Sequence, residues 1–180
     1  MFTQKRKKGQ VWIETTIYTV IGLVIIAILI TTATPQIEKI KDDGVLDKTM
    51  GGLLILNNKI SEIEQAGGNS REVQFTIAKG KLTIDAEENI IQYVLEDTRL
   101  ELTEPNVTIK EGDIYILTQE RGSRFDVYLT LNYSGSLNMT FDGEKKTDVL
   151  QASGTPYRIV MENVGDNGPL EDTHINFELW

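Results

Sequence analysis

The chain of 180 residues is long enough for one domain plus an additional segment. It contains no cysteine, which excludes thiol catalysis and thiolate metal sites. Its formal net charge of −9 disfavours nucleic acid, because phosphates attract basic surfaces. We therefore predict no nucleic-acid partner.

The N-terminal segment joins a basic leader to a long apolar run. Four consecutive basic residues form the leader: Lys5, Arg6, Lys7 and Lys8. Residues 15–37 follow without a charge, and a helix of that length, rising about 1.5 Å per residue, exceeds a hydrocarbon core of about 30 Å. The run is too long for an ordinary cleaved secretory signal, and the basic flank places residues 1–9 in the cytoplasm. We expect a membrane-spanning helix over residues 10–36 and an external domain after it.

A carboxylate interrupts the beginning of this apolar segment. At the centre of a bilayer helix such a group costs on the order of 2.5 to 3.5 kcal/mol, so Glu14 needs an explanation. One interpretation is an ordinary signal anchor in which Glu14 lies among the lipid headgroups. The second interpretation depends on the order of residues in this segment. Basic residues, Gly9, Gln10, Glu14 and an unbroken apolar tail follow one another.

This order resembles the class III signal of archaeal type IV pilin-like proteins, over about residues 1–35. The chain lacks the phenylalanine that follows the cut in the bacterial version, and it lacks the glycine-rich start of archaellins. The resemblance implies cleavage between Gly9 and Gln10 by a prepilin peptidase, and a role for Glu14 in filament assembly. It also implies a pilus assembly ATPase, a membrane platform protein and other pilin subunits as partners.

The chemistry of Glu14 agrees with that implied role. Cleavage would create an amino group on Gln10, and the two groups would lie four residues, hence one helical turn, apart. A carboxylate in the first turn also complements the helix dipole. Cleavage thereby supplies a positive charge with which the desolvated carboxylate can pair, which is the condition under which a buried charge is tolerated.

Beyond Pro35 the apolar residues again follow helical spacing. They fall on one face and form a stripe: Ile37, Ile40, Leu46, Met50, Leu53, Leu56, Ile60 and Ile63. We expect an amphipathic helical stalk over residues 37–66, with bends or short breaks at Gly44 and Gly51-Gly52, because glycine weakens a helix interior by about 1 kcal/mol relative to alanine. The stripe packs either against the chain's own downstream domain, the interpretation we favour, or against other subunits.

At Gly67-Gly68-Asn69 the apolar spacing changes from helical to alternating, so we place an external β head over residues 67–180. Alternation predicts strands at residues 73–77, 82–84, 100–102, 107–109, 114–117, 125–133, 137–141, 157–161 and 175–179. Residues 90–95 fit a strand or a helix. Lys79-Gly80-Lys81 predicts a hairpin between the first two strands.

The predicted fold class is α+β, with a long N-terminal membrane and stalk helix followed by an antiparallel β-sandwich-like head. Glycine-containing turns separate the later strands, at Gly112, Gly122, Gly135, Gly143, Gly154 and Gly165. We expect the head to fold from Gly67 onward unless the helical stripe is needed to complete the sandwich.

No constellation of residues indicates catalysis, and we predict that the protein is not an enzyme and holds no cofactor. His174 is the only histidine, and with no cysteine beside it the usual zinc sites are excluded. No serine lies in a G-x-S-x-G context. The acidic clusters Asp42-Asp43, Glu87-Glu88 and 166–172 lack EF-hand spacing, so solvated loops are favoured over a calcium site.

Three sequons lie in the predicted external part, at Asn106, Asn132 and Asn138. Each asparagine is a candidate for N-glycosylation where it is exposed, and unmodified asparagines at strand ends are an equal alternative.

We interpret the chain as a structural subunit of a type IV pilus-like filament. It would be anchored in the membrane with an external C-terminal domain, and would enter a cell-surface filament after cleavage. The alternative is an uncleaved, membrane-anchored extracellular β-sandwich that binds a carbohydrate or a protein.

Overall fold

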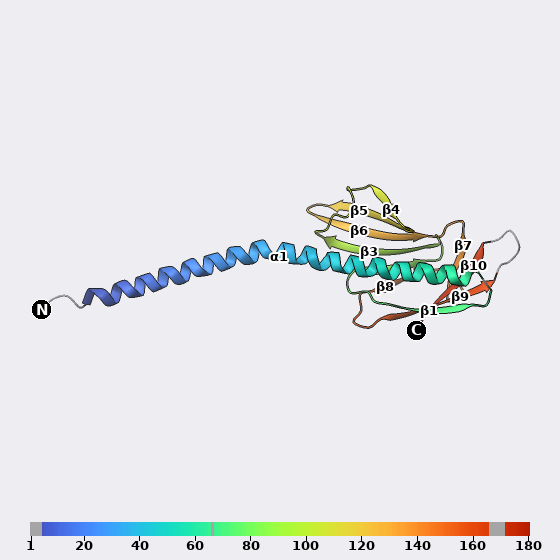
Figure 1. Cartoon of the computed structure of the whole chain (residues 1–180), viewed down its shortest axis with the longest axis horizontal. Coiled ribbons are helices and arrows are strands. Elements are labelled where there is room, and N and C mark those ends of the chain that lie inside the picture. Colours follow the sequence, from blue (N-terminus) through green and yellow to red (C-terminus); the bar gives the residue numbers. More distant parts are fainter. Residues whose placement is uncertain (1–4, 66, 166–171) are drawn as a thin grey trace. The chain divides into compact units, whose positions relative to one another are not determined.

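The computed structural model describes residues 5–65, 67–165 and 172–180, with side chains from residue 11 onward. One helix, α1 (Lys5–Glu64), precedes two β-sheets (Figure 1). The chain divides into two compact units, Met1–Ile40 and Lys41–Trp180, and α1 contributes to both. The predicted fold class, a long N-terminal helix followed by a β-sandwich-like head, is confirmed.

Helix α1 is unbroken through its 60 residues, including Pro35. Of the bends or short breaks expected at Gly44 and at Gly51-Gly52, the structure therefore contradicts the breaks. Packing explains why the helix continues at Gly52, since a Cβ added there would lie 2.9 Å from Cε2 of Phe75. The glycine lets an aromatic ring approach the helix backbone, and this contact outweighs the weak helical propensity of glycine.

Ten strands form the two sheets of the head. They are β1 (Ser70–Phe75), β2 (Lys81–Asp85), β3 (Ile90–Thr98), β4 (Thr108–Glu111), β5 (Ile114–Arg121), β6 (Arg124–Asn132), β7 (Leu137–Phe141), β8 (Thr147–Gln151), β9 (Tyr157–Gly165) and β10 (Thr173–Leu179). The four-stranded sheet has the order β1-β9-β10-β7, and the six-stranded sheet has the order β4-β5-β6-β3-β2-β8. Neighbouring strands are antiparallel, except that β7 and β10 are parallel.

The predicted hairpin at Lys79-Gly80-Lys81 is wrong, because β1 and β2 belong to different sheets. β1 pairs with β9, whereas β2 pairs with β3 and β8. Gly80 has a φ of +80°, and a Cβ there would collide with the carbonyl oxygen of Val94. This glycine therefore permits the chain to enter the six-stranded sheet close beside β3 rather than to reverse into β1.

Most predicted strands agree with the structure, including residues 90–95, which form part of β3. The strand predicted at residues 100–102 is wrong: Leu100 is buried, but its segment is not paired in a sheet. Strand β8 was missed because only Leu150 in it is buried, so the apolar alternation is weak. The predicted turn after Gly165 lies outside the described residues.

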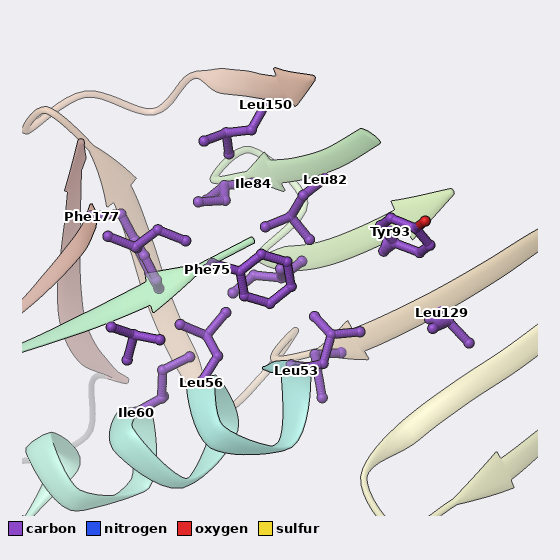
Figure 2. Close-up of a cluster of buried hydrophobic side chains, with 14 of the residues drawn as sticks. Leu53, Leu56, Ile60, Phe75, Leu82, Ile84, Tyr93, Leu129, Leu150 and Phe177 are labelled. Carbon is purple, nitrogen blue, oxygen red and sulfur yellow. The ribbon is translucent and has the colours of Figure 1, made fainter. Parts of the chain in front are cut away.

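Residues 46–63 of α1 complete the core of the head. Five side chains of the apolar stripe are buried there: Leu46, Leu53, Leu56, Ile60 and Ile63. Figure 2 shows Leu53, Leu56 and Ile60 directed from α1 toward Phe75, with Phe177 and side chains of the six-stranded sheet around them. The favoured interpretation of the stripe, packing against the chain's own domain, is confirmed for this part of the helix.

Hydrogen bonds also connect this part of α1 to the β head. Asp42 is only 4% exposed, and its carboxylate accepts hydrogen bonds from Lys79 Nζ and from Thr98 Oγ1, each at 2.7 Å. At the other end, Asn163 Nδ2 donates to the carbonyl oxygen of Ile63 at 2.7 Å, which satisfies one of the open carbonyls of a helix C-terminus. The expectation that Asp42 lies in a solvated acidic loop is therefore wrong.

Candidate assembly helix and surface sites

Residues 11–40 of α1 expose apolar side chains on every side. The exposed large apolar residues up to position 30 are Val11, Trp12, Ile13, Ile17, Tyr18, Val20, Ile21, Leu23, Val24, Ile25, Ile26, Ile28, Leu29 and Ile30. By length and composition this helix can cross a membrane, and none of its most apolar 18-residue window is buried within the described structure. The segment is therefore compatible with membrane anchoring.

Threonine hydroxyls within this segment are satisfied by the helix itself. Thr15 Oγ1 donates to the carbonyl oxygen of Val11 at 2.8 Å, and Thr19 Oγ1 donates to that of Thr15 at 2.8 Å. Thr31, Thr32 and Thr34 make the same kind of bond one turn back. In an apolar environment these bonds remove the penalty of an unpaired hydroxyl.

The predicted processing site lies at the beginning of α1. The backbone of Lys5, Arg6, Lys7, Lys8, Gly9 and Gln10 is helical, and the side chains of these residues lie outside the described part. Glu14 is exposed on the same helix, four residues after Gln10, so the two positions are one turn apart. The spacing required for a Glu14 carboxylate to approach an amino group on Gln10 is present in the helical backbone.

The three sequons occupy different environments. Asn106 is exposed in a turn with a φ of 63°, and Thr108 beside it is exposed. Asn132 is exposed, but its Oδ1 accepts a hydrogen bond from Ser134 N at 2.9 Å. Asn138 is half-buried in β7, and the hydroxyl of its sequon residue Thr140 is buried and donates to Asn176 Oδ1. Accessibility therefore favours Asn106 and disfavours Asn138 in the folded protein.

The outer face of the four-stranded sheet is charged and polar. Arg158 Nη2 lies 2.6 Å from Glu72 Oε2, and this contact lowers the pKa of Glu72 and raises the pKa of Arg158. His174 is half-buried, with Nε2 2.9 Å from Thr140 Oγ1. His174 is thus part of a hydrogen-bonded row that includes Thr140 and Asn176.

The outer face of the six-stranded sheet presents a different chemistry. On this face, the pairing of β6 with β3 and β5 places Gln92 beside Thr130, Thr130 beside Tyr115, and Tyr128 beside Leu117. Sequence reasoning missed these residues as a group. The available signal was the alternation in β5 and β6, in which polar and aromatic residues occupy the positions between buried aliphatic ones.

Comparison with known proteins identifies no relative: no family model, no curated protein and no solved structure matches this chain.

Proposed function

We propose that this chain is a structural subunit of a type IV pilus-like surface filament, assembled through the N-terminal part of α1. One observation carries the proposal. Residues 11–40 form a helix that exposes apolar side chains all round, and its only acidic residue before Glu38 lies one turn from Gln10. A helix of this kind requires either lipid or other helices around it.

Features of the helix surface support packing between copies. Thr15, Thr19 and Gly22 follow one another at spacings of four and three residues, which places three small residues along one line of the helix. Small residues allow two helix backbones to approach closely in an apolar environment. The surface around Trp12, Thr15 and Thr19 is open, so side chains of a neighbouring helix can reach it.

The assignment also gives Glu14 a physical role. In the bilayer, a prepilin peptidase would remove residues 1–9, and the new amino group on Gln10 would pair with Glu14 of the same chain or of a neighbour. An assembly ATPase and a membrane platform would then move the helix from lipid into a bundle of identical helices. The acidic heads would remain outside, where their charge keeps them soluble.

The N-terminus of the native protein tests this proposal. We expect N-terminal peptide mass spectrometry to find a chain beginning at Gln10, or at its cyclised form. Gly9→Val should block the cut, because the peptidase must accommodate the residue beside the bond. Gly22→Val is the matched control: no described atom lies within 4 Å of a Cβ added there, so cleavage should proceed.

Two outcomes would contradict the proposal. A native chain that keeps Lys5 to Gly9 in cells possessing the peptidase would favour the membrane-anchored binding module. A chain beginning after Ala33 would indicate a secreted β domain.

A further inference from the structure

Strands β4, β5 and β6 form one end of the six-stranded sheet (Figure 1). Two neighbouring hollows lie at this end. The first is a cleft of about 210 Å³ on the outer face, between Tyr115 and Tyr128. The second is a polar pocket of about 320 Å³ between the strand ends and α1, lined by Asn57, Glu64 and Asp113 among others. Tyr115 and Asn132 line both hollows, so the two are neighbours, and we call the pair the groove.

The cleft combines aromatic rings with uncharged polar groups. Tyr115 is 37% exposed, and Lys110 Nζ lies over its ring, 5.1 Å from the centroid. Gln92 Nε2 donates to Thr130 Oγ1 at 3.0 Å, and Gln92 Oε1 receives no hydrogen bond from the described residues. No charged residue of the described chain lines this cleft.

The pocket presents carboxylate acceptors held by a buried network. Tyr133 OH donates to Asn57 Oδ1 at 2.8 Å, and Asn57 Nδ2 donates to Asp113 Oδ2 at 2.9 Å. Burial raises the pKa of Tyr133, so its hydroxyl remains a donor. Glu64 is half-buried at the pocket, burial raises its pKa, and it forms no hydrogen bond or ion pair with the described residues. Asp113 Oδ1 and the Glu64 carboxylate are therefore available to accept hydrogen bonds.

We infer that this groove binds a neutral oligosaccharide supplied from outside the chain. Sugar rings present C–H faces that pack on aromatic rings, and hydroxyl groups that donate to amide and carboxylate oxygens. The net charge of −9 disfavours an anionic polymer. A groove with two adjoining hollows suits a chain of sugar units better than a single small molecule.

The position of the groove argues against a peptide. Peptides commonly add to the free edge of a sheet, where main-chain groups are open. Tyr115 and Tyr128 lie on β5 and β6, and both of these strands are paired on both sides. The edge strand β4 also lines the hollows, through Thr108 and Lys110, but β5 and β6 offer a ligand only side-chain groups.

Titration calorimetry on the full chain tests the inference independently of any filament. The protein is produced in a host without N-glycosylation and held in a phosphocholine detergent, which has no sugar headgroup. The probes are cellohexaose, maltohexaose, mannohexaose and chitohexaose. We expect at least one to bind with a Kd below about 1 mM.

Substitutions locate the binding. Tyr128→Ala and Asp113→Asn should each weaken binding at least about tenfold, whereas Tyr115→Phe keeps the ring and should change it less than about threefold. The matched control is Trp180→Ala. Trp180 follows β10, away from the groove, and its aromatic side chain is 76% exposed, so its removal should leave binding unchanged. Thermal melts identify any variant that no longer folds, and the isosteric Asp113→Asn then gives the deciding measurement.

Three results would overturn the inference. The first is the absence of binding by all four hexasaccharides at about 5 mM. The second is binding of peptides from a casein digest with no hexasaccharide binding. The third is a glycan on Asn132 of the native protein, because it would fill the groove with the chain's own sugar. None of these results bears on cleavage after Gly9, so the filament proposal would stand or fall separately.

Discussion

The two parts of α1, residues 11–40 and 41–64, are both rich in aliphatic residues but use them differently. In the first part the large apolar side chains are exposed all round. In the second they fall on one stripe, and Leu46, Leu53, Leu56, Ile60 and Ile63 are buried in the head. A single secondary-structure element therefore completes the core of one folded unit and exposes its apolar side chains in the other. Apolar content alone did not separate these roles, whereas its distribution around the helix did.

Removing the second part should have the largest effect. A chain beginning at Gly67 loses the five buried helix residues, each worth about 1.5 to 3 kcal/mol, and their sum is as large as the whole net stability of about 5 to 15 kcal/mol of many domains. We expect no cooperative thermal transition by circular dichroism. A chain beginning at Lys41 keeps the compact unit and should melt cooperatively. Equal melts for the two chains would mean that the strands form a sufficient core alone.

Glu14→Gln tests the first part of the helix by filament assembly. The amide keeps the shape of the side chain and loses its charge, so insertion and cleavage should be normal, while the yield of filaments seen by electron microscopy should fall at least about tenfold. Glu38→Gln is the control, a neutralisation on the same helix further from Gln10. A normal filament yield from Glu14→Gln would refute charge pairing as the basis of assembly.

A pair of leucine truncations compares the two parts directly. Leu56→Ala should destabilise the head by about 2 to 5 kcal/mol, because it leaves a cavity in a packed core. Leu23→Ala removes the same atoms from a side chain that is 61% exposed, and it should leave head stability unchanged. Urea unfolding of the full chain in detergent, followed by near-ultraviolet circular dichroism, measures both. Similar losses from the two variants would show that the helix parts are not distinct.

The smallest effect is expected at a solvated ion pair of the head. Arg158 holds the pKa of Glu72 below its ordinary value of 4.5, so the pair contributes stability above that pH and loses it as the pH falls through the lowered pKa. Glu72→Gln should therefore lower the melting temperature slightly at pH 7 and have no effect at strongly acid pH. High salt should shrink the difference at pH 7. A difference that grows on acidification would contradict this assignment.

Local patterns account for the parts of the fold that were predicted correctly. The turns at Gly112, Gly122 and Gly143 have positive φ values, which glycine adopts without strain. Strands β6, β7 and β10 were found because alternating apolar residues match a sheet with one buried face. The strand at residues 100–102 failed because Leu100 is buried by a turn segment, and alternation cannot distinguish that from a strand.

The two candidate sites also differ in how far local sequence indicates them. Gly9, Gln10 and Glu14 could be proposed as a site from the sequence because their order along the chain carries the pattern, and helical geometry fixes the spacing of Gln10 and Glu14. The groove was not recognised, because Asn57, Asp113 and Tyr128 come from α1, a turn and β6. Their proximity depends on long-range pairing that no local spacing encodes.

The sequence by itself determined a long apolar helix with a carboxylate near its start, followed by short alternating strands. These features depend on side-chain period and on turn residues, which act within a few positions. Only the tertiary structure decided that β1 pairs with β9, that β7 lies parallel to β10, and that Asp42 is buried against Lys79. Such choices depend on which surfaces exclude water together, and that is a property of residues far apart in the chain.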